Sequence, residues 1–266
     1  MLDSPHSGTL YSHDFKHAIS RSALRDAEDT LVDDLYDFAP ALGIALLAAQ
    51  FPRSYVDVNR SRFDIDRKLL TAAWPGKALP SRKSELGKGV VWRCLDNGAP
   101  IYQAPLTCEE VEDRLQMCWD PYHASLREVL DGTARKYGKV FHLNCHSMPS
   151  NPGEFALESP LTAALPDFVL GDQDGRTANA EITRFLQTQI EARGYSCGVN
   201  SPYKGVELIG AYSDPKCNRH SIQIEINRKL YLHESSRERS SNYARLKTDL
   251  AQILSAFKAS FAEYEI

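Results

Sequence analysis

The sequence predicts one α/β domain over residues 1–266, a three-layer α/β/α sandwich with a mainly parallel sheet between layers of helices. Helical and strand-like segments alternate over the whole length, and neither an internal repeat nor a linker interrupts them. The composition is that of a globular protein, with 42% hydrophobic and 25% charged residues. A chain of 266 residues is also long enough to bury a full core without disulfides or a structural metal.

In the first part of the chain, apolar residues three and four positions apart predict an amphipathic helix over Asp29–Leu42. Gly43 would cap its C-terminal end, because glycine readily adopts the left-handed conformation found there. The apolar run at residues 44–49 and the segment Tyr55–Val58 then predict one or two buried strands.

The second part predicts the same alternation. Its clearest strand is His220–Asn227, where isoleucines occupy one face and Gln223, Glu225 and Asn227 the other. Further helices are expected over residues 109–130 with Thr107 or Thr133 at an end, over 182–190 with Gly194 as cap, and over 246–261. Further strands are expected over residues 139–143 and 167–170.

A long loop separates two of these strands. Residues 148–166 contain four prolines and little periodicity. Because long ordered loops of this kind tend to be active-site lids or binding loops, we expect one of the two here, and closure over substrate is a hypothesis.

Charge and cysteine usage restrict the class of partner. The formal net charge is −4, which disfavours nucleic acid or an anionic membrane as the main partner. The six cysteines include no CxxC pair, which indicates reduced thiols. No targeting signal and no membrane-spanning segment is recognisable, so we expect a soluble, cytoplasmic protein.

Chemistry is expected where polar residues directly follow apolar runs, because ligands of open α/β sheets bind beyond the carboxyl ends of the strands. Four segments meet this criterion: Ser4–Gly8, Asp57–Arg60, Asn144–Ser147 and Glu225–Arg228.

Two of these segments carry histidines, His6 and His146. Imidazole nitrogens and carboxylate oxygens suit a catalytic zinc ion, which keeps one position open for water. No HExxH motif is present, and the residues lie far apart in the sequence. The alternatives are that Ser4–Gly8 is only a turn and that His146 is a satisfied polar residue at a strand end. Cys145 precedes His146, but adjacent residues of a strand point to opposite faces, which disfavours a thiol nucleophile.

The other two segments share the pattern acid-x-Asn-Arg, which places Arg60 and Arg228 at strand ends. Two such guanidinium groups are suited to clamping carboxylates. Glu225 belongs to the same pattern, and the alternative for it is a solvent-facing position on an edge strand.

Taken together, these segments resemble the N-formylglutamate amidohydrolase family. The matching stretches occur in the family's order and cover nearly all of the chain: Ser4–Gly8, Glu28–Tyr36, Pro52–Arg60, Pro121–His123, Asn144–Pro149, Asp167–Asp172, Asn200–Tyr203 and Gln223–Arg228.

The resemblance implies a zinc-carboxypeptidase-like or phosphorylase/hydrolase-like fold with a mixed sheet. The implied reaction is hydrolysis of N-formyl-L-glutamate, or a similar N-acyl acidic amino acid, to formate and L-glutamate at the end of a histidine-degradation route. One zinc ion per chain would be held by His6, Asp29 and His146, and Asp33 and Asp57 are alternatives for the third ligand.

The resemblance also implies roles for the remaining site residues. Glu225 would be the general base that activates zinc-bound water. Arg60 and Arg228 would hold the substrate carboxylates, and Asn59 or Asn227 would bind the amide or the oxyanion. Two other functions remain open: a zinc amidase or carboxypeptidase-like enzyme acting on another N-acyl amino acid or short peptide, and a non-catalytic dicarboxylate-binding protein.

Overall fold

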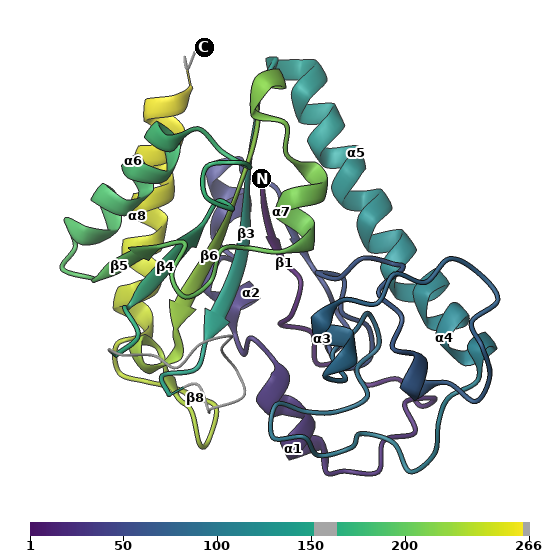
Figure 1. Ribbon diagram of the computed structural model, residues 1–266. Helices are drawn as coiled ribbons and strands as arrows, with labels where there is room; N and C mark the ends of the chain where they lie inside the picture. The colour runs from purple at the N-terminus through teal and green to yellow at the C-terminus, as the bar shows by residue number, and fades with distance from the viewer. Residues whose placement is uncertain (152–163, 263–266) are drawn as a thin grey trace. The chain divides into compact units, whose positions relative to one another are not determined.

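The computed structural model describes residues 1–151 and 164–262 of the chain (Figure 1). They form two compact units, and each is described by itself. The sheet unit comprises the described residues of Met1–Ser4, Leu31–Leu47 and Val129–Ile266, and the loop unit comprises Pro5–Thr30 and Ala48–Glu128. The single domain over residues 1–266 stays a prediction.

The sheet unit is built on a six-stranded sheet in the order β2-β1-β3-β6-β4-β5. The strands are β1 (Leu2–Ser4), β2 (Leu46–Ala48), β3 (Val140–Met148), β4 (Phe168–Gly171), β5 (Cys197–Val199) and β6 (Arg219–Asn227). Three neighbouring pairs are parallel, β1 with β3, β3 with β6 and β4 with β5, whereas β4 runs antiparallel to β6. The short strands β7 (Leu232–His233) and β8 (Glu238–Arg239) pair with each other.

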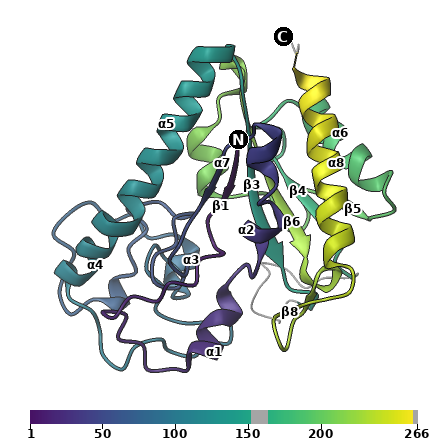
Figure 2. The ribbon, with the colours of Figure 1, turned by 180° about the vertical axis from the view of Figure 1, so that it is seen from behind.

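Helices lie on both faces of the sheet, which confirms the predicted three-layer α/β/α fold (Figures 1 and 2). Helices α2 (Val32–Leu35), α6 (Ala180–Glu191) and α8 (Tyr243–Phe261) cover the apolar face, and α7 (Glu207–Tyr212) lies on the other. The three helices cover this face because the residues of β6 alternate as predicted. The isoleucines of β6 pack into one core with the buried residues of these helices. Short 3₁₀ turns connect the elements at Ala39–Leu42, Pro215–Cys217 and Arg228–Leu230.

The opposite face of the two central strands is polar and nevertheless buried. Three pairs of neighbours form it: His142 beside Ser221, Asn144 beside Gln223, and His146 beside Glu225. Strand β6 lies between β3 and β4, and Glu225 is only 8% exposed. The alternative of a solvent-facing Glu225 on an edge strand is therefore wrong.

The loop unit has little regular strand structure. It contains α1 (Arg21–Leu24), α3 (Arg82–Glu85), α4 (Cys108–Arg114) and 3₁₀ turns at Arg25–Ala27 and Arg67–Leu69. A π-helical segment, Leu115–Trp119, connects α4 to α5 (Asp120–Tyr137), which continues into the sheet unit. The helix predicted over residues 109–130 is thus confirmed, and Thr107 forms a capping box with Glu110 at its start.

Two predicted elements are wrong. The helix over Asp29–Leu42 is interrupted, because Leu31 has a left-handed φ of 62° and Asp29 N–H bonds to the His6 carbonyl instead of a helical partner. Only α2 and the turn at Ala39–Leu42 remain, and the latter ends at Gly43 with φ 70°, as expected of a cap. Tyr55–Val58 is a turn and not a strand, since the Tyr55 and Val56 N–H groups both bond to the Pro52 carbonyl.

The remaining predicted strands and helices are confirmed, and β3 extends five residues beyond the predicted Leu143 to Met148. The strand predicted as buried from residues 44–49 is present as β2, but it lies at the edge of the sheet and is only partly buried. Of the loop expected to form a lid or a binding loop, residues 152–163 lie outside the described residues. Among the residues that the structure describes, no helix is both long and apolar enough to cross a membrane.

Candidate active site

In the loop unit, His6 lies between two carboxylates. Its Nε2 is 2.7 Å from Asp57 Oδ1, and its Nδ1 is 3.3 Å from Asp29 Oδ2. An ionised carboxylate can only accept hydrogen bonds, so Nε2 donates to Asp57 and Nδ1 carries the ring's lone pair in the neutral imidazole. Two acceptors facing each other, Nδ1 and Asp29 Oδ2, are favourable only with a proton or a cation between them.

Asp29 is fixed beside His6 through its backbone. Its N–H donates to the His6 carbonyl at 3.0 Å, and the Ser7 hydroxyl donates to the Asp29 carbonyl at 2.9 Å. The segment also needs Gly8, because a Cβ there would lie 2.3 Å from the Phe51 carbonyl oxygen. Ser4–Gly8 thus runs from the end of β1 through a bend at Pro5 and His6, and it presents the candidate metal ligand His6.

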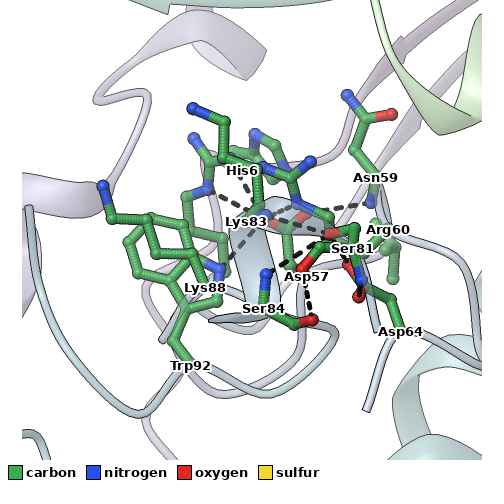
Figure 3. A network of polar contacts seen from close by, with 12 residues as sticks. His6, Asp57, Asn59, Arg60, Asp64, Ser81, Lys83, Ser84, Lys88 and Trp92 are labelled. Carbon is green, nitrogen blue, oxygen red and sulfur yellow. Dashed lines mark hydrogen bonds and ion pairs between the residues drawn. The ribbon is translucent and has the colours of Figure 1, made fainter. Parts of the chain in front are cut away.

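Asp57 is a fully buried carboxylate on which several donors converge (Figure 3). Besides His6, it accepts from Asn59 N–H at 3.0 Å, from Arg53 Nη2 at 3.0 Å and from Trp92 Nε1 at 3.1 Å. Burial alone would raise its pKa, but His6 and the arginines Arg53 and Arg60 hold the pKa well below the usual range. Asp57 is therefore ionised and orients the His6 ring.

Aromatic side chains next to the start of α5 hold the segment that follows Asp57. The His123 Nε2 lies 2.8 Å from the Val58 carbonyl, and Trp119 Nε1 donates to the Arg60 carbonyl at 2.9 Å. Their two rings stack with centroids 3.6 Å apart. The backbone on both sides of Asn59 is thereby fixed.

The surroundings of Arg60 are rich in positive charge. Lys88 is 7% exposed and pairs with Asp96. Burial and the nearby cations Lys83, Arg53 and Arg60 lower the pKa of Lys88 to about 8. Such a concentration of cations favours an anionic ligand.

In the sheet unit, His146 and Glu225 are neighbours on the polar face of β3 and β6. His146 is 3% exposed, and its Nε2 lies 2.7 Å from Asn144 Oδ1. Gln223 Nε2 donates to Glu225 Oε1 at 2.9 Å, which fixes one carboxylate oxygen. A nearly buried carboxylate is thus positioned beside a histidine.

The predicted arginine and asparagine of the second segment lie at the end of β6. Arg228 Nε donates to the Ser147 hydroxyl at 3.0 Å. The Asn227 amide is already engaged, since it accepts from Lys229 N–H at 3.2 Å and donates to the Pro166 carbonyl at 3.3 Å. The structure therefore gives Asn227 a role in the turn after β6.

Among the described residues, His6 and Asp29 in the loop unit and His146 in the sheet unit are buried candidates for metal ligands, each offering one ligand atom, whereas Asp33 and Asp57 are not among these candidates. Two imidazoles and a carboxylate are a donor set that zinc accepts. Both histidines also bond a buried acceptor through Nε2, as metal-binding histidines commonly do. The residues present therefore fit a zinc ion.

Cys145, in contrast, lies in the apolar core and is fully buried. Burial raises the pKa of its thiol well above the usual value. Because the thiolate is the nucleophilic form, this argues against a thiol hydrolase.

Comparison with known proteins establishes the class of protein first: the chain is a hydrolase acting on amide bonds. The model of the N-formylglutamate amidohydrolase family matches residues 1–232, and the chain therefore belongs to this family.

Individual relatives agree with this assignment. The chain is 30% identical over 240 residues to the N-formylglutamate deformylase of Pseudomonas putida, covering 88% of this chain and 82% of the relative. It is 28% identical over 241 residues to that of Pseudomonas aeruginosa, covering 89% and 83%.

Solved structures show the same relationship. The crystal structure of the N-formylglutamate amidohydrolase from Ralstonia eutropha JMP134 is 42% identical and superposes with a TM-score of 0.94, covering 97% of this chain and 92% of that one. The gene product Atu2144 from Agrobacterium tumefaciens, with 16% identity and a TM-score of 0.69, shares the fold.

Sequence reasoning misses several supporting residues. The sequence offers Asp57 only as an alternative metal ligand. Nothing in the sequence except the polar type of the residue indicates that Asp57 accepts a hydrogen bond from His6. Trp119 lies within the helix predicted over residues 109–130, where its spacing is that of an apolar core position, but its indole N–H donates to the Arg60 carbonyl. For His123, which contacts the Val58 carbonyl, the sequence does give an indication, because Pro121–His123 is one of the stretches that resemble the family.

Proposed function

We propose that this protein hydrolyses N-formyl-L-glutamate to formate and L-glutamate with the help of one zinc ion. The observation that carries the proposal is the buried pair of His146 and Glu225 on neighbouring strands of an amidohydrolase-family fold. The names of the two Pseudomonas relatives and of the Ralstonia structure support the substrate.

His6, Asp29 and His146 would hold the zinc ion. When bound, zinc polarises the carbonyl oxygen of the amide and makes water easier to deprotonate. Support for this ligand set comes from the donor types, from their burial and from the close approach of His6 Nδ1 to Asp29 Oδ2. Asp57, bonded to the other nitrogen of His6, would serve as its orienting partner.

Glu225 would act as the general base. It takes a proton from the attacking water and then delivers it to the nitrogen of the departing amino acid, so that the amide C–N bond breaks without releasing an unprotonated amine anion. Gln223 donates a hydrogen bond to one oxygen of the Glu225 carboxylate. This bond also restricts where the second oxygen points, because both oxygens belong to one planar group.

Arg60 and Arg228 would bind the two carboxylates of the substrate. For Arg60, this role is supported by the cations around it, which include Lys88. Asn59 or Asn227 would bind the amide or the developing oxyanion; Asn227 would have to exchange the bonds that its amide makes in the turn after β6. The product L-glutamate fits a cytoplasmic step at the end of histidine degradation.

The test is formate release from N-formyl-L-glutamate by zinc-loaded protein, with a chelator-treated sample and the analogue N-formyl-L-glutamine, whose side chain is uncharged, as controls. Chelator-sensitive release that is specific for the acidic substrate is the expected result. Release that survives complete metal removal would refute the zinc role. Absence of release from protein shown to contain zinc would refute the substrate and favour another N-acyl amino acid.

A further inference from the structure

A row of buried polar side chains runs through the sheet unit and leads to His146. Central strands of a largely parallel sheet are usually apolar on both faces. Here β3 instead carries His142, Asn144 and His146 at every second position, and Asp3 of β1 lies beside Asn144 in the register. Asp3, His142 and Asn144 are all fully buried.

The contacts within this row fix the orientation of each group. Asn144 Nδ2 donates to Asp3 Oδ1 at 2.8 Å, and His142 Nε2 lies 2.8 Å from the same oxygen. An ionised carboxylate accepts hydrogen bonds and donates none, so Asn144 must turn its NH₂ group towards Asp3. Its carbonyl oxygen therefore points to His146, 2.7 Å from Nε2.

This orientation determines the tautomer of His146. Facing a carbonyl oxygen, Nε2 must carry the proton, and Nδ1 then carries the lone pair. Asp3 thus acts on His146 across two hydrogen bonds, with the Asn144 amide as the connecting group. His6 differs, because Asp57 binds its Nε2 directly.

We propose that Asp3 is a positioning residue for the metal centre: through Asn144, it holds the tautomer in which His146 Nδ1 binds the metal. The inference rests on the proposed function, in which His146 is a zinc ligand. It explains why a carboxylate is retained in the interior of a sheet, where an apolar residue of similar volume would cost less to bury.

Three variants test the proposal. Asp3→Asn keeps the shape but replaces a pure acceptor by a group that also donates, so Asn144 can turn over and His146 is no longer held in one tautomer. Asn144→Leu removes the connection altogether. The double variant Asp3→Asn/Asn144→Asp moves the carboxylate one position along the row. It preserves the hydrogen bonds between positions 3, 144 and 146, because the carboxylate now at position 144 accepts both from the amide introduced at position 3 and from His146. His142 keeps its contact with position 3 by taking the other tautomer, in which Nε2 accepts from the introduced amide and Nδ1 donates to the Ser221 hydroxyl.

The matched control is Ser221→Ala. The Ser221 hydroxyl lies 3.1 Å from His142 Nδ1, at the other end of the row, so its loss leaves the bonds to His146 intact.

The measurement is the zinc dissociation constant, obtained by competition with a chromophoric chelator, together with denaturant unfolding of the metal-free proteins. We expect Asp3→Asn and Asn144→Leu to bind zinc at least about tenfold more weakly than the wild type. The double variant should return to within about threefold of the wild-type affinity, and Ser221→Ala should equal it.

Two results would overturn the inference. One is a folded Asp3→Asn protein with wild-type zinc affinity. The other is a double variant as weak as Asp3→Asn, since that would mean that the carboxylate's effect does not pass through position 144. A wild-type protein that binds no zinc would instead refute the proposed metal centre itself, together with the inference built on it, and the wild-type titration alone distinguishes this case.

Discussion

Replacing Asp57 by asparagine should destabilise the loop unit strongly. The substitution keeps the shape of the side chain but removes a buried charge that faces Arg53 and turns one of the two acceptor oxygens into a donor. If the remaining oxygen stays with His6, the new NH₂ group meets Arg53 Nη2 and Trp92 Nε1, which are both donors. Breaking a buried ion pair costs about 3–5 kcal/mol. The Arg53 side chain is 19% exposed, so water relieves part of this cost, and we expect about 3 kcal/mol.

Denaturant unfolding of the metal-free protein, followed by tryptophan fluorescence, measures this loss. All three tryptophans, Trp74, Trp92 and Trp119, belong to the loop unit, so the signal reports its unfolding. The matched control lies in the same unit: Lys16→Gln breaks the ion pair of Lys16 with Glu110, whose side chains are 71% and 32% exposed. Exposed pairs contribute about 0–1 kcal/mol, so this variant should unfold almost as the wild type does. Equal effects of the two substitutions would refute the argument from burial.

Three further predictions concern packing, reactivity and capping. Gly171→Ala should lower the thermal unfolding temperature, because a Cβ there would lie 2.6 Å from the Lys204 backbone carbonyl carbon; unchanged melting would contradict the described close approach. In alkylation followed by mass spectrometry, exposed Cys217 should react in the native protein and buried Cys145 only after unfolding; early labelling of Cys145 would revive the thiol mechanism. Thr107→Ala should lower the free energy of unfolding by about 1 kcal/mol through loss of the capping box, and no change in the denaturation midpoint would contradict this.

The sheet could be predicted because its signals are local. The isoleucines of β6 alternate with polar residues, and this pattern alone places Glu225 opposite the apolar core. The interrupted helix after Asp29 could not be predicted in the same way. Its leucine spacing is helical, but tertiary bonds to the His6 segment and the left-handed Leu31 override that preference.

For the site, residue types were predictable and their partners were not. Histidines and acids that follow apolar runs predict His6, His146 and Glu225 as site residues, because such groups gather near the ends of strands, and their roles stay predictions. The partner of His6 is 51 positions away and Asn144 lies 141 positions from Asp3, and contacts over such distances follow from the fold. A single sequence gives no signal for them.

The most direct test of the central claim, that Glu225 is the base of an N-formylglutamate deformylase, is formate release by zinc-loaded Glu225→Gln. Glutamine keeps the shape of the side chain and removes its ability to take a proton. We predict that kcat falls by at least about 100-fold. Zinc content and the dissociation constant for L-glutamate should stay within about threefold of the wild-type values, since Arg60 and Arg228 are unchanged. Formate release at the wild-type rate by this variant would contradict the claim.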